Sequence, residues 1–221
     1  MRHYDKKEKR ALTVYVFIFL LLVLGIAIGG HFSYSNFERE FHRQAGNQVS
    51  AIAELKENAL VDWRRERLVD AQSFYRNLVF SGLVERYFEN PADDETKKQI
   101  ISRLEYYQSY ANYDGICLLD VTGIHRLVIP ANLEEFKKVD ALLMADAAAS
   151  LDSGNVIFGD FQRDPNVEGK IYISILVPLF AEQSDGRPLG VLVLHINPET
   201  YLYPYINQWP IPSDTAETLL V

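Results

Sequence analysis

The chain of 221 residues has almost no cysteine. Cys117 is the only one, so an intrachain disulfide is excluded. This residue lies in the apolar run 116–119, which indicates a small buried hydrophobe rather than a catalytic thiol.

The sequence also lacks the short motifs of common catalytic sites. It contains no GxxxxGKS or GxxxxGKT loop, no HExxH, no CxxC and no GxSxG. The histidines show no metal-ligand spacing; they are His3, His31, His42, His125 and His195. We therefore predict no catalytic residue, no metal site and no cofactor within these residues.

Basic residues are scarce after residue 30. Residues 31–221 carry 17 of the 22 Lys and Arg residues and 28 of the 30 Asp and Glu residues, a net charge of about −11. A nucleic-acid surface needs a basic stripe, whereas only short cationic clusters such as Arg64, Arg65 and Arg67 are present. Nucleic acid is therefore excluded as a partner.

Charge is absent altogether from residues 11–30, which follow a head, residues 1–10, with five Lys and Arg residues. Twenty helical residues cover ~30 Å, the thickness of the hydrocarbon core of a bilayer, so we predict a transmembrane helix in contact with lipid. The positive head is expected to be cytoplasmic, with the rest of the chain outside an inner membrane, in the periplasm. A cleaved signal peptide is the alternative, because the run ends in small residues.

A long helix is predicted after the span. Residues 33–79 contain no proline and only Gly46, and apolar residues recur at helical spacing. We assign residues 33–80 to a stalk and first helix, either solvated or paired with a second copy as a homodimer. Trp63 and Arg67 lie one turn apart, the first as a core anchor and the second either snorkelling or contacting an anion.

The pattern then changes to strands. Asp94 is a candidate N-cap for a helix running toward Tyr110. Alternation and turn residues predict strands at 115–120, 124–129, 156–162, 171–181 and 189–196, with helices at 134–151 and 198–205. Short connections favour antiparallel neighbours, so the fold class is α+β, a five-stranded antiparallel sheet flanked by helices.

The last residues have the pattern of a connector followed by a further strand. Residues 209–212, Trp-Pro-Ile-Pro, are typical of a stiff connector, and residues 215–221 have the pattern of an opening strand. We expect residues 208–221 to be a linker and the start of a second, truncated module.

Three features of residues 153–197 belong together: a Gly-Asp-Phe strand end followed by Arg163 and Asp164, an Ile-Tyr-Ile-Ser-Ile strand closing on Val177 and Pro178, and Asp-Gly-Arg-Pro-Leu-Gly-Val-Leu-Val at 185–193. They resemble the second half of a Cache domain, the extracytoplasmic relative of the PAS sensor fold. The helix VDWRRERLVDA at 61–71 and the tail TAETLLV are similar to those of double-Cache receptors such as bacterial sensor histidine kinases. The resemblance implies that residues 81–207 form the distal, PAS-like Cache module.

Alternation in the strand 171–177 places Tyr172, Ser174 and Leu176 on one face. The opposite face is entirely aliphatic. The Tyr and Ser face lines a ligand pocket or, alternatively, contacts solvent or a covering helix. Cache domains bind small molecules on this face, so the resemblance favours the pocket.

Four further residues complete the candidate ligand-binding set. Asp160 and Arg163 end the preceding strand, and Arg126 projects from the hairpin; each is a candidate charged contact or a surface ion pair. The resemblance places His195 where amino-acid-binding double-Cache domains carry an Asp, and their Arg-x-Trp-Tyr signature is absent. Both departures count against an amino-acid ligand, so the small-molecule ligand is unknown.

The resemblance implies the ligand-sensing region of a membrane-bound signal-transduction receptor, of sensor histidine kinase type, coupled to the membrane through the long helix. Two alternatives stay open. One is a Cache-like interaction or dimerisation module that binds a periplasmic protein without a small ligand. The other is a membrane-anchored enzyme with a dispersed active site, which needs polar residues converging in one cleft.

Overall fold

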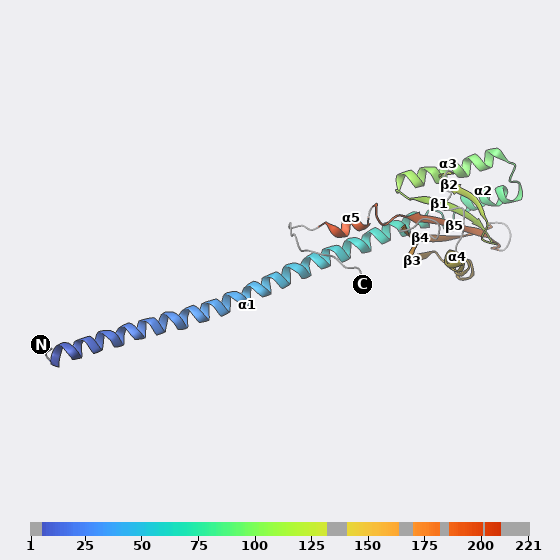
Figure 1. The fold of residues 1–221 in the computed structure, drawn as a ribbon. Coiled ribbons are helices and arrows are strands. Elements are labelled where there is room, and N and C mark those ends of the chain that lie inside the picture. The colour runs from blue at the N-terminus through green and yellow to red at the C-terminus, as the bar shows by residue number, and fades with distance from the viewer. Residues whose placement is uncertain (1–5, 132–140, 164–169, 182–185, 201, 209–221) are drawn as a thin grey trace. The chain divides into compact units, whose positions relative to one another are not determined.

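The computed structural model describes residues 6–131, 141–163, 170–181, 186–200 and 202–208 (Figure 1). The chain divides into two units, residues 1–58 and 59–221. A continuous helix, α1 (Lys6–Gln72), forms the described part of the first unit and continues into the second.

The first unit contains the apolar segment predicted to span a membrane. By length and composition, α1 is the one helix in the described part of the chain that is able to cross a bilayer. Its large apolar side chains between Leu12 and Ile28 are all exposed, with exposed fractions of 48–75%. Exposed apolar surface of this extent suits a lipid environment, and the segment is therefore a candidate span.

The helix predicted from Ser33 to Val79 is interrupted, which corrects the sequence analysis. α1 ends at Gln72, and a separate helix, α2 (Leu78–Glu89), begins after a turn in which Arg76 has a φ of 54°. The side chain of Asn77 caps α2 by accepting the N–H of Phe80 at 3.1 Å. At the break, Arg76 has a left-handed backbone conformation and Asn77 caps the next helix. Neither proline nor glycine therefore marks the break in the sequence.

The third helix, α3 (Asp94–Tyr110), is capped by the residue before the predicted cap. Asp93, not Asp94, accepts the N–H groups of Glu95 and Thr96. The Asp93 carboxylate also accepts a hydrogen bond from the Thr96 hydroxyl at 2.6 Å. A carboxylate at this position satisfies orphan amides and complements the helix dipole.

The five predicted strands are present and form one antiparallel sheet in the order β2-β1-β5-β4-β3. Their bounds are β1 (Gly115–Asp120), β2 (His125–Ile129), β3 (Ile157–Arg163), β4 (Ile171–Phe180) and β5 (Pro188–Ile196). The predicted α+β class, with a long apolar helix ahead of a sheet flanked by helices, is confirmed.

Two shorter helices differ from their predicted bounds. α4 is described over Ala141–Ser153, and residues 134–140 of the predicted helix lie outside the described residues. α5 (Leu202–Asn207) begins later than predicted. The predicted connector and strand at 209–221 also lie outside the described residues.

The sheet has a helix layer on each face (Figure 1). One face packs against the end of α1 and against α2 and α3, and its core includes Trp63, Phe74, Ile175 and Leu194. Trp63 is 9% exposed and meets the Phe158 ring edge-on at 6.0 Å, which confirms its role as a core anchor. The opposite face packs against α4 through a smaller apolar cluster.

Candidate functional site

Tyr172 and Ser174 share a face of β4 with Leu176, as the alternation predicts, and the structure directs this face toward α4. Leu176 of the same face belongs to the apolar cluster under α4, whereas Ile173 and Ile175 belong to the opposite core. Tyr172 is 4% exposed and Ser174 is fully buried. The polar side chains therefore continue an apolar layer instead of meeting solvent.

Ser174 and His195 form a buried hydrogen-bonded pair. They are register partners across β4 and β5, so their side chains leave the same face of the sheet. Ser174 Oγ and His195 Nδ1 lie 3.0 Å apart, and the Tyr172 ring meets the imidazole edge-on at 5.2 Å between centroids. Three predicted site residues are thus brought together by two central strands.

Burial keeps His195 uncharged. Desolvation, followed by the positive charges of His125 and Lys170, lowers the pKa of His195 to about 3. Lys170 is itself held by Asp114, with Nζ and Oδ2 2.8 Å apart. The imidazole is therefore a neutral hydrogen-bonding group at physiological pH, not a cation.

Gln162 extends this cluster and was missed from the sequence. It is the register partner of Tyr172 across β3 and β4 and is 4% exposed. Its side-chain NH₂ donates to Asp146 of α4 at 3.0 Å, and its Oε1 is buried without a hydrogen-bond partner in the described part of the chain. We call Gln162, Tyr172, Ser174 and His195 the polar patch. The available signal was an amide two residues after Asp160, on the same face of the alternating strand.

The other predicted site residues are not brought into the polar patch. Asp160 is exposed at the irregularity of β3 and accepts the N–H of Phe161 at 2.7 Å, and Arg163 is exposed at the end of that strand. Arg126 pairs with Asp120 at 2.8 Å. Asp120 is five residues along β1 from the register partner of His195, about 17 Å at ~3.4 Å per residue.

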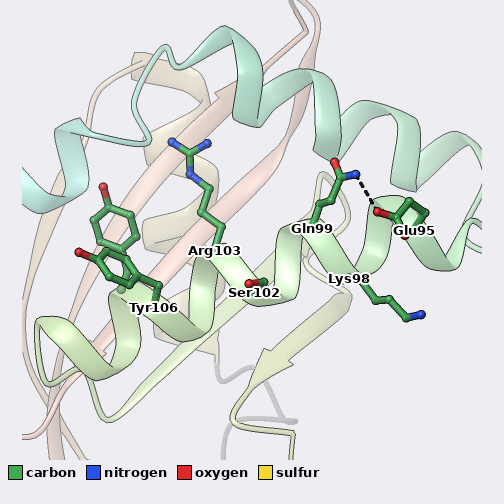
Figure 2. A pocket seen from close by; sticks show the side chains of 7 residues that line it. Glu95, Lys98, Gln99, Ser102, Arg103 and Tyr106 are labelled. Atoms are coloured by element: carbon green, nitrogen blue, oxygen red, sulfur yellow. Dashed lines mark hydrogen bonds between the residues drawn. The ribbon is translucent and has the colours of Figure 1, made fainter.

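Three hollows lie away from the polar patch. The largest is an open groove of about 630 Å³ along α3, which we call the α3 groove. Figure 2 shows that its labelled side chains all come from this one helix, with Gln99 donating to Glu95. A hollow of about 300 Å³ lies beside Arg126 and Phe88, and a more enclosed one of about 140 Å³ lies beside Trp63 and Arg67.

Among the described residues, no group of three or more His, Cys, Asp or Glu side chains is placed to hold a metal ion. Burial raises the pKa of Cys117 to about 12, so this thiol is a poor nucleophile.

No protein-family model and no curated protein sequence matches the chain. Solved sensory domains do match its fold. The sensory domain of the Campylobacter jejuni chemoreceptor Tlp3 superposes with a TM-score of 0.52 at 16% identity, covering 77% of this chain and 66% of that one. The ligand-binding domain of Tlp3 in complex with 4-methylisoleucine gives 0.50 at 17%, with 74% and 62% covered.

The V. cholerae histidine kinase DctB sensor domain gives a TM-score of 0.54 at 12% identity, covering 75% of this chain and 59% of that one. The chain spans less than two thirds of the length of these solved structures. Identities this low establish the fold alone. The fold is that of Cache-type sensory ligand-binding domains from chemoreceptors and a histidine kinase.

Proposed function

We propose that this chain is the extracytoplasmic ligand-sensing region of a membrane-anchored signal-transduction receptor of the double-Cache, sensor histidine kinase type. Residues 1–10 are the cytoplasmic head, residues 11–30 the single inner-membrane span, and residues 33–80 the stalk and first helix. Residues 81–207 are the distal module, in the periplasm, and residues 208–221 begin a second module. The Cache-type fold and the apolar first half of α1 support this assignment.

The observation that carries the proposal is the polar patch. Four polar or aromatic side chains, each under 5% exposed, interrupt the apolar face under α4. Burying such groups costs free energy compared with Val or Leu at the same positions. A ligand that donates a hydrogen bond to Gln162 Oε1 would offset part of that cost, and small molecules with donors and acceptors are the class that fits.

A route from the polar patch to α1 supports coupling to the membrane. The N–H of Asp114 donates to the carbonyl of His195 at 2.8 Å. The adjacent residue, Tyr113, donates its hydroxyl to Asp70 of α1 at 3.2 Å. Arg67 of α1 donates to the carbonyl of Ala111 at 2.6 Å. A shift of β5 at His195 would therefore act, through Asp114, on two contacts that hold α1: that of Tyr113, one residue before Asp114, and that of Ala111, three residues before it.

Ligand binding signals only through a difference in affinity for two arrangements of α1. Equal affinity for both would shift nothing, and couplings of ~1–3 kcal/mol are typical. The two contacts of Tyr113 and Arg67 with the end of α1 are the ones that we expect to differ between the arrangements.

A thermal-shift screen of the full chain in nanodiscs tests the proposed function. We expect at least one member of a panel of carboxylates, amines, sugars and nucleobases to raise the melting temperature in a saturable manner. The same ligand should fail on a Tyr172→Phe, Ser174→Ala double variant, because both hydroxyls are lost with little change in volume. Equal stabilisation of the variant would refute the site.

A protein-binding module is the second candidate, and one surface favours it. Tyr106 and Tyr110 are 63% and 71% exposed, and their rings stack at 5.8 Å with 7° between planes. Exposed Tyr beside Arg103 in the α3 groove has the composition of interface hot spots. If the thermal screen is silent, cross-linking from a reactive group at position 102 to a periplasmic protein, lost when Tyr106→Ala is added, would support this function.

We propose that the stalk pairs with a second copy. Phe37, Phe41 and Val49 of α1 are exposed by 72, 62 and 57%, and they recur at helical spacing. An apolar stripe on a helix leaving a membrane is covered most simply by the same stripe of a partner.

A further inference from the structure

The hollow beside Trp63 and Arg67 lies on the opposite side of the sheet from the polar patch. We call it the joint pocket, because α1, the end of α3 and the exit of β5 all line it. Its floor is apolar, formed by Trp63, Ala111 and Ile196, each at most 9% exposed. Trp63 and Ile196 belong to the core on the α1 face, so the joint pocket shares no residue with the polar patch.

The size of the joint pocket limits what it can hold. Its volume is about 140 Å³. At ~30 Å³ per water it has room for about four waters, or for one molecule of about five non-hydrogen atoms. Larger metabolites such as nucleosides and sugars do not fit.

The guanidinium of Arg67 leaves one edge open toward this space. Its Nη1 is engaged by the Ala111 carbonyl at 2.6 Å and by Asp70 at 3.4 Å. Its Nε is buried without a hydrogen-bond partner among the residues that the structure describes, and Nη2 lies 3.9 Å from Glu66, beyond hydrogen-bonding distance. The Nε and Nη2 edge is the one on which arginine binds a carboxylate with two parallel hydrogen bonds.

Two further donors lie at the same rim. Asn197 Oδ1 accepts the N–H of Glu199 at 2.9 Å, which fixes the amide orientation and leaves its NH₂ as a donor. Thr200 adds a hydroxyl. Two carboxylates lie near the guanidinium: Asp70, 3.4 Å from Nη1, and Glu66, whose side chain is 67% exposed; of these, only Glu66 lines the joint pocket.

We propose that the joint pocket is a second small-molecule site, specific for a short-chain monocarboxylate such as acetate or propionate. The carboxylate binds the Nε and Nη2 edge of Arg67, and the alkyl group lies on the indole of Trp63 and on Ile196. Because Arg67 also holds Ala111, an occupied pocket ties α1 more firmly to the end of α3.

The exposed Glu66 makes the proposal distinguishable from a merely structural arginine. Its negative charge, 3.9 Å from Nη2, competes with a bound carboxylate for that edge. Glu66→Gln should therefore tighten binding about two- to five-fold. If Nε instead bonds only a buried water, Glu66→Gln should leave the affinity for a carboxylate unchanged.

Trp63 supplies a local readout. The chain has two tryptophans, so Trp209→Phe leaves the indole of the joint pocket as the sole fluorophore. We would titrate this full chain in nanodiscs with propionate, and with 1-propanol and propylamine at matched ionic strength. We expect a saturable change in Trp63 emission with propionate alone, weakened at least ten-fold by Arg67→Lys, which keeps the charge but loses the planar fork.

Three results would overturn the proposal. The first is an equal response to 1-propanol. The second is undiminished propionate binding in folded Arg67→Lys protein. The third is no saturable response in a cooperatively folded Glu66→Gln protein. If Arg67→Lys does not fold, Ala111→Leu, which fills the floor, must abolish the response while the melting temperature is retained, and continued binding to it refutes the site.

Discussion

Replacing His195 by asparagine should remove a defined part of the pH dependence of stability. In the folded chain the pKa of His195 is lowered from 6.5 to about 3 by burial and by the positive charges of His125 and Lys170. The unfolded chain therefore binds a proton below pH ~6.5 that the folded chain refuses, and stability falls as the pH falls from ~6.5 toward ~3.

The size of the effect follows from the shift. At pH ~5 the unfolded imidazole is ~1.5 pH units below its pKa, and each unit is worth about 1.4 kcal/mol. The wild-type chain should thus lose about 2 kcal/mol between pH ~7.5 and pH ~5 through His195 alone. Asparagine can keep a hydrogen bond to Ser174 and does not titrate, so His195→Asn should lack this loss.

Urea unfolding at the two pH values, followed by Trp63 fluorescence in a Trp209→Phe background, measures the difference. Carboxylates and other histidines titrate in both proteins and cancel in the comparison. An equal loss in wild type and His195→Asn would show that the imidazole is not held neutral, and would refute the reasoning.

Three other predictions can be checked independently. Gly190→Ala should lower the free energy of unfolding by about 3 kcal/mol or more, because an added Cβ would overlap the facing β1 backbone. Gly82→Ala, with open space around it, should raise the free energy of unfolding by ~0.5–1 kcal/mol. Thermal unfolding that ranks the two variants otherwise contradicts the pairing of β1 with β5. Tyr113→Phe should cut ligand-induced cross-linking changes in α1 while ligand affinity changes less than three-fold, and an unaltered response would exclude this contact from the route. Cysteines at Val49 and Ile52 should cross-link two copies more efficiently than cysteines half a turn away, and a flat profile would exclude the paired stalk.

The sheet was predictable because its local signals agree. Alternating apolar residues and short turns rich in Gly, Asp and Pro predict the strands, and a period of two predicts that Tyr172 and Ser174 share a face, whereas the burial of that face under α4 needed the structure. The break between α1 and α2 was not predictable in the same way. It depends on Arg76 adopting a positive φ, which is uncommon for arginine and has no sequence signature.

Which residues form the polar patch could be predicted only with knowledge of the strand register. Alternation alone cannot say that Ser174 lies opposite His195, or that Gln162 lies opposite Tyr172, because register is set by pairing between distant segments. The same register separates Arg126 from His195 by the length of β1. A list of polar residues on predicted strands therefore contains members from both ends of one sheet.

The central place of β5 has a consequence for how the protein is made. The β1–β2 and β3–β4 hairpins are local and can form as soon as their residues emerge, but β1 and β4 are joined only through β5. The strand β5 pairs with β1 across about 80 residues of chain, a long-range contact that folds slowly. Until residue 196 has been synthesised, the two hairpins have open edges that can pair with other chains. Pairing of β5 with both β1 and β4 closes these edges and completes the sheet.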